Sequence, residues 1–232
     1  IRTTATTIDP DKNIDFTVPE PLDSISLASF HFNEKIDSVL VPRDFIIRPV
    51  TDKPRTYRFY AEWIPEHTYE IKVDTGAFVS IYGKRSEGFT KNIRVKGLDN
   101  YSALFVTLTN TDTAAIVQLI DGNDKVVKQQ KPVNHKTEFF FITPGTYYLR
   151  LFMDRNGNGK WDEGSYALHQ QAEEVYYYPQ PIILKALWDV NQTWNPYLTP
   201  VYQQKPGKIT RQKPDKEKSV RNKNATRNNQ KR

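Results

Sequence analysis

The chain has 232 residues, of which 38% are hydrophobic and none is cysteine. This length suffices for two ordinary domains that each bury a core, and the missing thiols exclude disulfide bonds and thiolate metal sites. No run of ~18 apolar residues is present, so the sequence offers no candidate membrane-spanning helix. Because the chain begins at Ile1 and its only methionine is Met153, we expect it to be processed or to be the later part of a longer protein, with any signal peptide or lipid anchor upstream.

The net charge of +6 is distributed unevenly. Residues 203–232 contain eleven Lys or Arg against Asp215 and Glu217, a net charge of +9, so the preceding residues carry −3. This stretch has too few apolar residues to fold alone. It predicts a basic tail suited to an acidic protein surface or to anionic lipid head groups. Nucleic acid is the least favoured partner, because neither interleaved aromatic residues nor a recognition fold is present.

The first half of the chain predicts short β-strands. Residues 1–20 are polar and are expected to finish a strand whose partners lie upstream. From Ser24 a period-2 alternation begins, with Ile25 on one face and Phe30 and Phe32 on the other, which is typical of a strand. Further strands are expected at residues 44–48, 55–63, 68–73 and 89–95. No window has a sustained helical period, and strands at this spacing predict a β-sandwich.

Three segments of this half resemble the bacterial Ig-like domains of surface and envelope proteins. They are residues 30–37 (FHFNEKID), residues 69–73 (YEIKV) and residues 76–83 (GAFVSIYG). In that family an F-x-F-[NS] strand is followed by a Y-x-[IL]-x-[IV] strand and by a turn that usually carries Asp where this chain has Ser80. The resemblance covers roughly residues 15–97 and implies that residues 1–97 form an Ig-like sandwich.

The second half also predicts strands. They are expected at residues 101–109, 114–120, 125–129, 136–142, 146–153, 175–178 and 181–188. Residues 110–112 (NTD) and 121–123 (DGN) favour tight hairpins between consecutive strands, because these residue types tolerate positive φ. We therefore expect a second sandwich at residues 98–188. Residues 189–232 are left as an extended basic tail, either disordered or held by a partner.

An oxygen-rich loop follows the predicted strand at residues 146–153. Side-chain or carbonyl oxygens fall at positions 1, 3, 5, 7 and 9 of this loop, in Asp154, Asn156, Asn158, Lys160 and Asp162. Gly159 occupies position 6, where a calcium loop makes its sharp turn. These residues are candidate ligands for a structural Ca²⁺ ion. Position 12 is Ser165 and not the bidentate Glu of a high-affinity calcium loop. The dissociation constant for Ca²⁺ is therefore expected in the ~10⁻⁴ to 10⁻³ M range.

A second interpretation of the loop needs no metal. Asn156-Gly157 and Asn158-Gly159 are strong turn formers that could simply join two strands, with the carboxylates in solvent. If calcium binds, we expect it to stiffen the turn and not to catalyse, because all candidate ligands come from one loop without a nearby base.

The residues around this loop carry the most specific resemblance in the chain. Residues 144–164 (PGTYYLRLFMDRNGNGKWDEG), with residues 173–179 (EEVYYYP) behind them, resemble the transthyretin-like or carboxypeptidase-regulatory-like sandwich modules of Bacteroidota envelope proteins. Taken with the Ig-like half, the chain is similar to Ig-like-domain envelope lipoproteins of that phylum. The resemblance implies a location in the bacterial cell envelope.

The sequence offers no catalytic constellation. It lacks a G-x-S-x-G elbow, a phosphate-binding P-loop, G-x-G-x-x-G and H-E-x-x-H. Its four histidines are widely spaced, and the adjacent Glu173 and Glu174 would point to opposite faces of a strand. We therefore predict a non-enzymatic protein.

Aromatic residues are abundant near the second unit. They are Tyr147, Tyr148, Trp161, Tyr176, Tyr177, Tyr178, Trp188 and Trp194. An exposed, coplanar row of such rings would bind sugars or a protein, whereas the more ordinary interpretation places them in the core and rim of a sandwich. The sequence thus predicts an all-β protein of two sandwiches that acts as a structural or interaction subunit of an envelope assembly, with protein partners engaged through residues 203–232. The alternative is a cell-surface carbohydrate-binding module.

Overall fold

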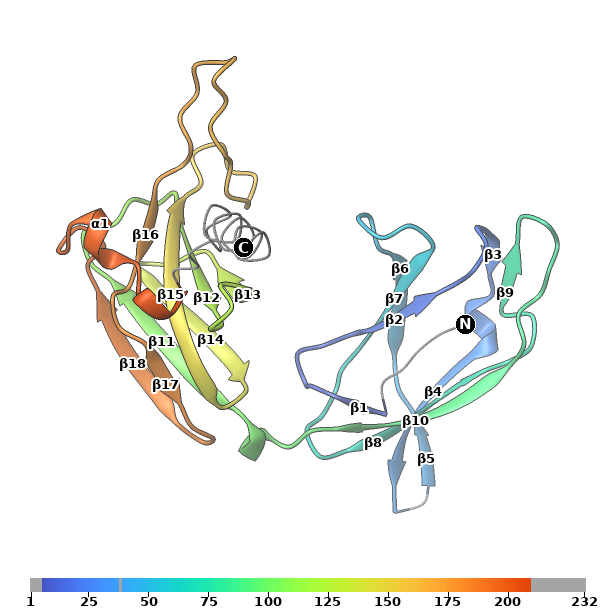
Figure 1. Ribbon diagram of the computed structural model, residues 1–232. Helices are drawn as coiled ribbons and strands as arrows, with labels where there is room; N and C mark the ends of the chain where they lie inside the picture. Colours follow the sequence, from blue (N-terminus) through green and yellow to red (C-terminus); the bar gives the residue numbers. More distant parts are fainter. Residues whose placement is uncertain (1–5, 38, 210–232) are drawn as a thin grey trace, which may run out of the picture. The chain divides into compact units, whose positions relative to one another are not determined.

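The computed structural model describes residues 6–37 and 39–209, and Figure 1 shows that nearly all regular structure is β-strand. The predicted all-β class is therefore confirmed. The chain divides into two compact units between Tyr101 and Ser102, four residues beyond the expected boundary at residue 97. The difference arises because Tyr101 belongs to the first unit, where its hydroxyl donates to Asp9 Oδ1 at 2.6 Å. In the described part of the chain, no helix has the length and apolar character needed to cross a membrane.

Within its described residues, the first unit is built from ten strands and two short 3-10 turns. The strands are β1 (Thr7–Ile8), β2 (Ile14–Thr17), β3 (Leu22–Ile25), β4 (Phe30–Ile36), β5 (Val39–Pro42), β6 (Phe45–Pro49), β7 (Thr56–Ala61), β8 (Thr68–Val73), β9 (Phe78–Ser80) and β10 (Phe89–Val95). One sheet has the order β1-β10-β8-β4-β5, a second has the order β2-β7-β6, and β3 pairs with β9. The 3-10 turns span Leu27–Ser29 and Leu98–Asn100.

Two expectations for this unit were wrong. The first described strands have partners later in the chain, because β1 lies parallel to β10 and β2 lies antiparallel to β7. The alternation that begins at Ser24 is not one strand, since the 3-10 turn at Leu27–Ser29 separates β3 from β4. The turn leaves Leu27 exposed, while Phe30 and Phe32 are buried on one face of β4 as expected.

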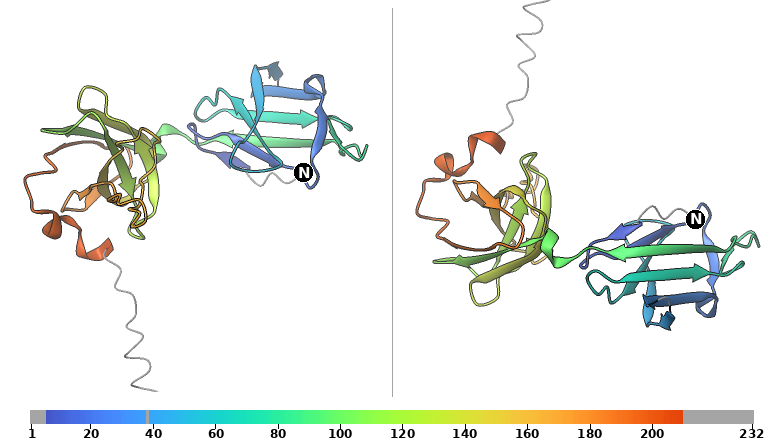
Figure 2. Two further views of the ribbon diagram at one scale, coloured as in Figure 1. Left: turned by 90° about the horizontal axis from the view of Figure 1, so that it is seen from above. Right: turned by 90° about the horizontal axis from the view of Figure 1, so that it is seen from below.

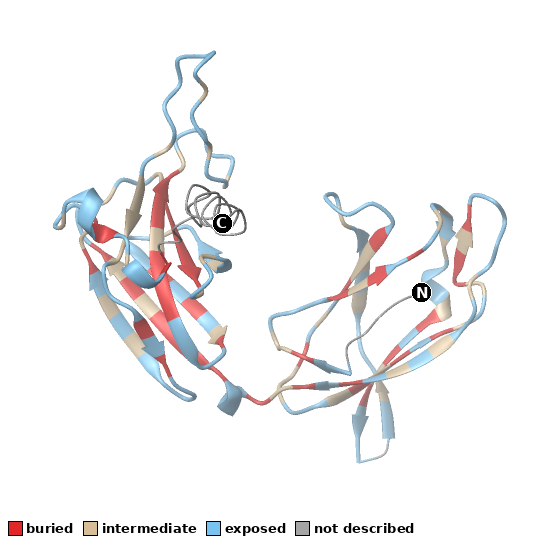
Figure 3. Ribbon diagram, in the orientation of Figure 1, coloured by how far each residue is buried: buried red, intermediate tan, exposed pale blue. Residues whose placement is uncertain are grey.

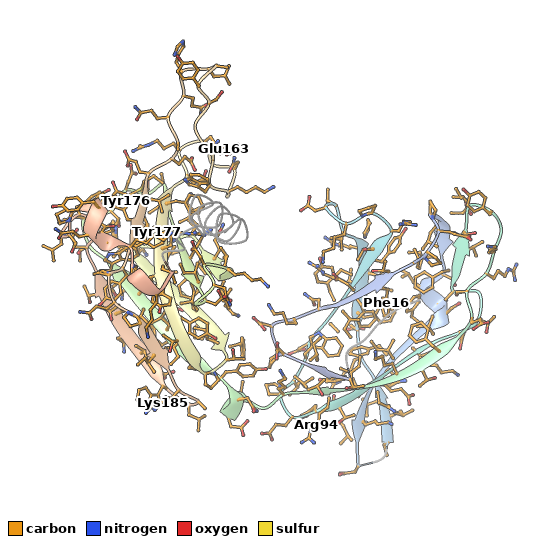
Figure 4. The ribbon with its side chains drawn as sticks, in the orientation of Figure 1. Phe16, Arg94, Glu163, Tyr176, Tyr177 and Lys185 are labelled. Carbon is orange, nitrogen blue, oxygen red and sulfur yellow. The ribbon has the colours of Figure 1, made fainter. Side chains whose placement is uncertain are left out.

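Aromatic rings fill the core of the first unit. Phe59 is fully buried, stacks on Phe45 at 5.0 Å between ring centroids, and meets Phe32 edge-on at 5.2 Å. Phe16, which is labelled in Figure 4, packs edge-on against Phe59 at 6.1 Å and so joins β2 to β7. Such offset and edge-to-face pairs are the geometries that aromatic rings prefer. The core thus fixes how the strands of this unit pack together.

Ser80, at the position where Ig-like turns usually carry Asp, still organises its turn. Its side chain is buried, and Oγ accepts the backbone N–H groups of Tyr82 and Lys84, each at 3.3 Å. A hydroxyl oxygen with two acceptor sites can replace one carboxylate oxygen in this role. Ser80 therefore holds the turn that follows β9.

A buried carboxylate connects β4 to two flanking loops. Glu34 has no exposed side-chain surface, accepts a hydrogen bond from Arg43 Nε at 2.7 Å and contacts His67 Nδ1. The hydrogen bond with His67, assisted by Arg43, lowers the pKa of Glu34 below its ordinary value and outweighs burial, which alone would raise it.

This lowered pKa predicts an acid dependence of stability. Because the folded state holds the Glu34 proton less tightly than the unfolded state, Glu34 contributes stability above its unfolded pKa of about 4.3, and the contribution is lost as the pH falls through the folded value. We expect the free energy of unfolding, measured by denaturation curves, to fall less steeply between about pH 6 and pH 3 in Glu34→Gln than in the wild type. Glu62→Gln, which removes an exposed carboxylate, serves as the control and should leave the slope unchanged. Equal slopes for both variants would contradict the prediction.

The second unit is a sandwich of two sheets. Its strands are β11 (Ser102–Leu108), β12 (Ala115–Ile120), β13 (Val126–Gln130), β14 (Lys136–Ile142), β15 (Gly145–Met153), β16 (Val175–Tyr177), β17 (Ile182–Leu184) and β18 (Asp189–Trp194). One sheet has the order β14-β11-β18, and the other has the order β13-β12-β15-β16, with β17 also paired to β15. Leu104, Val117, Leu149 and Leu151 lie fully buried in the core.

The expected tail at residues 189–232 was wrong over its described part. β18 begins at Asp189 and runs parallel to β11, with Leu108 opposite Trp194, so residues 189–194 form a strand of the sandwich. Helix α1 (Val201–Gln204) and a 3-10 turn (Gly207–Ile209) follow, and Gln204 and Ile209 are both buried. The views in Figure 2 show this segment lying along the second unit. The remainder of the predicted tail, residues 210–232, lies outside the described residues.

One of the two predicted hairpins was also wrong. Residues 121–123 do join antiparallel neighbours, since β12 pairs with β13. Residues 110–112 instead carry the chain from β11 in one sheet to β12 in the other. A turn-forming composition permits a hairpin but does not require one.

Gln204 fastens the end of the described chain to the edge of a sheet. Its Oε1 accepts the N–H of Tyr177 on β16 at 2.9 Å, and its Nε2 donates to the carbonyls of Pro196 and Thr199, both at 2.7 Å. Beyond it, Ile209 packs against Ile120 and Tyr148. This segment therefore covers an edge strand that would otherwise present an unpaired N–H group.

We expect Gln204→Leu to destabilise the second unit by about 1–3 kcal/mol, because it leaves buried backbone groups without partners. Amide exchange at Tyr177 should become faster in the same variant. The neighbouring exposed residue offers a control, Gln203→Leu, which should change neither quantity. A loss of stability no larger than that of the control would show that Gln204 does not fasten the segment.

Candidate metal centre

The predicted calcium loop lies at the base of a long hairpin. β15 ends at Met153 and β16 begins at Val175, and Figure 1 shows the intervening residues 154–174 projecting beyond the strands of the second unit. Figure 3 shows most of this hairpin as exposed. Its conformation is set largely by polar contacts within the hairpin, and at its base Gln129 Nε2 also donates to the carbonyl of Gly159 at 2.7 Å.

Asp154 organises the first turn of the hairpin. Its Oδ1 accepts the N–H of Asn158 at 3.0 Å, and its Oδ2 accepts the N–H of Gly159 at 2.9 Å. Gly157 and Gly159 have φ values of 74° and 73°, in the left-handed region that glycine adopts without strain. The sharp turn expected at Gly159 is therefore present.

Asp162 lies opposite and receives the amides of the loop. The Nδ2 atoms of Asn156 and Asn158 donate to the same oxygen, Asp162 Oδ2, at 2.7 and 2.6 Å. Their side-chain oxygens accept the N–H groups of Asn158 and Lys160 at 3.1 and 2.7 Å. The side-chain amide hydrogens of Asn156 and Asn158 thus supply the partial positive charge beside the Asp162 carboxylate. A bound cation would have to replace them as partners of Asp162.

Glu173, which sequence reasoning did not include, joins the two arms of the hairpin. Its Oε1 accepts the N–H of Arg155 at 2.9 Å, and its Oε2 accepts the N–H of Asp162 at 3.2 Å. Its backbone carbonyl accepts Trp161 Nε1 at 3.0 Å. The only available signal was the pair of acidic residues before β16, which spacing within the loop could not connect to Asp154. We call Asp154, Asn156, Asn158, Asp162 and Glu173 the hairpin brace.

The donor set suits a hard cation that binds weakly. It offers carboxylate and amide oxygens, the ligands that Ca²⁺ prefers. Of the predicted ligands, the structure brings together Asp154, Asn156, Asn158 and Asp162, while Lys160 contributes only its N–H to the hydrogen bonds of the loop. No group of three or more His, Asp or Glu side chains within the described ranges is placed to hold a metal ion. Calcium binding therefore stays a prediction.

The tip of the hairpin combines small and polar residues with two exposed apolar side chains. Residues 164–172 include no Asp, Glu, Lys or Arg. Ser165 and Gln170 exchange backbone hydrogen bonds of 2.9 and 3.0 Å, and the turn between them leaves Tyr166 95% exposed and Leu168 74% exposed. At Gly164 a side chain would collide with the opposite arm, since a Cβ atom would lie 2.8 Å from Ala172 N. The tip is thus a closely paired turn that displays two apolar side chains.

Several of the aromatic residues near the second unit are buried, as the interpretation that places them in the core predicts. Tyr147, Tyr148 and Trp194 are buried, whereas Trp161 and Trp188 are about half exposed. The rings that meet do so at steep angles, 82° between Tyr176 and Tyr197 and 76° between Tyr178 and Trp194. These pairs do not form the coplanar row that a sugar-binding face requires.

The comparisons with known proteins leave the family open. No protein-family model matches the chain, and no curated protein sequence does. Among solved structures, it is similar to the major pilin subunit BcpA of Bacillus cereus, at 14% identity over 82% of this chain and 66% of that one, with a TM-score of 0.28. It is also similar to the Bacillus anthracis TIE protein, at 13% identity over 82% of this chain and 32% of that one, with a TM-score of 0.28. A third is SGBP-B of the Bacteroides ovatus mixed-linkage glucan utilization locus in complex with a mixed-linkage heptasaccharide, at 11% identity over 82% of this chain and 43% of that one, with a TM-score of 0.23.

The chain thus spans less than two thirds of the length of each of these proteins. Likenesses at this level of identity and TM-score assign neither an activity nor a partner.

Proposed function

We propose that the chain is a non-enzymatic interaction subunit of a bacterial cell-envelope assembly and that it presents the hairpin at residues 154–174 to a protein partner. The observation that carries this proposal is the exposed, uncharged tip with Tyr166 and Leu168 on a hairpin whose base is held by the brace. Exposed aromatic and aliphatic anchors are the residues that dominate the binding energy of protein interfaces.

The hairpin brace gives the tip a defined position before it meets a partner. Backbone N–H groups donate to the carboxylates of Asp154 and Glu173 and so hold both arms at their base, and the Ser165–Gln170 pair closes the tip. A segment that is ordered in advance loses less conformational entropy on binding, and its affinity rises accordingly. The brace therefore serves binding rather than chemistry.

Calcium would reinforce the brace. The carboxylates of Asp154 and Asp162, the side-chain oxygens of Asn156 and Asn158 and the carbonyl of Lys160 would hold the ion. Bound Ca²⁺ supplies positive charge that offsets the repulsion between carboxylates. Glu173 would remain the link between the arms, because its two oxygens already accept backbone N–H groups.

The envelope location rests on the resemblance to Ig-like-domain lipoproteins of Bacteroidota. The motif at residues 144–164 supports it, and in such proteins the lipid anchor would precede the first sandwich. Under this proposal the second sandwich, whose strands β15 and β16 lead into and out of the hairpin, supports it.

Affinity purification from a native envelope extract tests the proposal. We expect proteins that co-purify with the wild-type chain to be lost with the double variant Tyr166→Ser/Leu168→Ser. Both side chains are exposed, so the variant should fold normally. The matched control is Tyr82→Ser/Leu27→Ser, which removes an exposed Tyr and an exposed Leu from the first unit and should retain the partners. Retention of every partner by the tip variant would overturn the proposal, and so would enrichment of a glycan instead of a protein.

A further inference from the structure

The first turn of the hairpin contains the only two Asn-Gly pairs in the sequence, Asn156-Gly157 and Asn158-Gly159. In such a pair the backbone nitrogen that follows Asn can attack the side-chain amide, because glycine has no side chain to block the approach. Asparagine is thermolabile through reactions of this kind. The two pairs are therefore candidate sites of covalent modification.

The two asparagines have nearly the same surroundings. Both are exposed, and their Nδ2 atoms donate to Asp162 Oδ2, at 2.7 Å from Asn156 and 2.6 Å from Asn158. Each side-chain oxygen accepts the backbone N–H two residues later. The glycines that follow them have φ values of 74° and 73°, and a Cβ atom on either one would meet nothing within 4 Å. Exposure, steric access and backbone conformation thus do not distinguish the two pairs.

The backbone N–H groups of the two glycines differ in their hydrogen bonds. The Gly159 N–H donates to Asp154 Oδ2 at 2.9 Å, whereas the Gly157 N–H has no acceptor among the residues that the structure describes. The backbone nitrogen must give up its proton before it attacks. A carboxylate that accepts this N–H disfavours the loss of the proton, because it stabilises the protonated form and repels the anion. Asp154 therefore restrains the nitrogen of Gly159 but not that of Gly157.

We propose that Asn156 is a site of spontaneous deamidation and that Asp154 protects Asn158 from the same reaction. The backbone nitrogen of Gly157 loses its proton to hydroxide and attacks Cγ of Asn156. The new N–Cγ bond forms, the Cγ–Nδ2 bond breaks, and Nδ2 leaves as ammonia after it takes a proton from water. Water then opens the resulting succinimide ring at one of its two carbonyls and leaves aspartate or isoaspartate at position 156.

This modification would remove one interaction of the hairpin brace. The Asn156 Nδ2 that donates to Asp162 Oδ2 is replaced by a carboxylate oxygen, which has no proton to donate when ionised. Two adjacent carboxylates also repel each other. We therefore expect the N–H of Asp162, which donates to Glu173, to exchange faster in the modified chain. The proposal depends neither on the partner of the hairpin nor on calcium.

Peptide mapping of the full chain, after incubation in mildly alkaline buffer without Ca²⁺, tests this inference. Trypsin cleaves after Arg155 and Lys160, and tandem mass spectrometry of the released peptide assigns deamidation to Asn156 or to Asn158. We expect Asn156 to convert at least about tenfold faster than Asn158, since a hydrogen bond to a charged group protects by about this factor or more. In concentrated urea, where the turn is lost, the two rates should be similar.

A variant of the protecting carboxylate separates the role of the hydrogen bond from that of charge. Asp154→Ala removes the acceptor of the Gly159 N–H and should raise the rate at Asn158 toward that at Asn156. The matched control, Glu163→Gln, removes an exposed negative charge from the same hairpin and should leave the ratio of the two rates unchanged. Thermal melts of both variants check that the sandwich is retained.

Three results would overturn the proposal. The first is an equal rate at Asn156 and Asn158 in the folded wild-type chain. The second is conversion at Asn156 no faster than at Asn134, which is also exposed but precedes a histidine. The third is an unchanged rate at Asn158 in Asp154→Ala, which would show that the Asp154 carboxylate does not protect it.

Discussion

Replacing Phe59 with alanine is expected to lower the free energy of unfolding of the first unit by about 3–5 kcal/mol. Phe59 has no exposed surface and contacts the rings of Phe16, Phe32 and Phe45. Alanine removes these contacts and leaves a cavity among rigid rings that cannot collapse to fill it. A loss of this size is a large part of the stability of an ordinary domain.

Calorimetry of the full chain measures this effect, because the two units have separate cores. We expect the transition of the first unit to shift to lower temperature in Phe59→Ala and that of the second unit to stay in place. Phe140→Ala, at a half-exposed phenylalanine, is the control and should cost less than about 1 kcal/mol. A comparable small loss for Phe59→Ala would contradict the aromatic core described above.

Asp154→Asn is expected to weaken calcium binding at least about tenfold from a wild-type dissociation constant in the ~10⁻⁴ to 10⁻³ M range. The substitution preserves the volume of the side chain but removes the negative charge. It also places an amide nitrogen where Oδ1 or Oδ2 now accepts the N–H of Asn158 or Gly159. Both the ion and the first turn of the hairpin therefore lose a partner.

Titration calorimetry, with Trp161 fluorescence as a second readout, measures calcium affinity. Trp161 reports on the brace because its Nε1 donates to the backbone carbonyl of Glu173. The control is Glu163→Gln, which removes an exposed negative charge from the same hairpin (Figure 4) and should change the affinity by less than about threefold. Equal weakening by the two variants would indicate a diffuse charge effect in place of a defined site.

Residues 68–73, 89–95 and 136–142 form strands with the bounds that the sequence predicts. In these segments apolar and polar residues alternate, or β-branched and aromatic side chains lie between clear turn signals. The local pattern is therefore enough to predict where each strand begins and ends. β18 was missed because its sequence, DVNQTW, is largely polar and its parallel partner β11 lies far earlier in the chain. No local signal records a pairing of that kind.

In the candidate site, too, the residues that are close in sequence could be predicted, whereas those brought in from elsewhere in the chain could not. The residues of the loop follow a fixed spacing, and the structure brings Asp154, Asn156, Asn158 and Asp162 together as that spacing predicts. Glu173 enters only because the second arm of the hairpin returns to the base of the first. Gln204 was likewise unpredictable, since its three partners lie on β16 and on the segment that precedes α1.

Amide hydrogen exchange across residues 154–174, with and without Ca²⁺, tests most directly whether this hairpin is a braced contact element. We predict that the N–H groups of Asn158 and Gly159, together with those of Arg155 and Asp162 that bond to Glu173, exchange more slowly than in an unfolded chain, and more slowly again when Ca²⁺ is added. Exchange of all four at unfolded rates in both conditions would contradict the account.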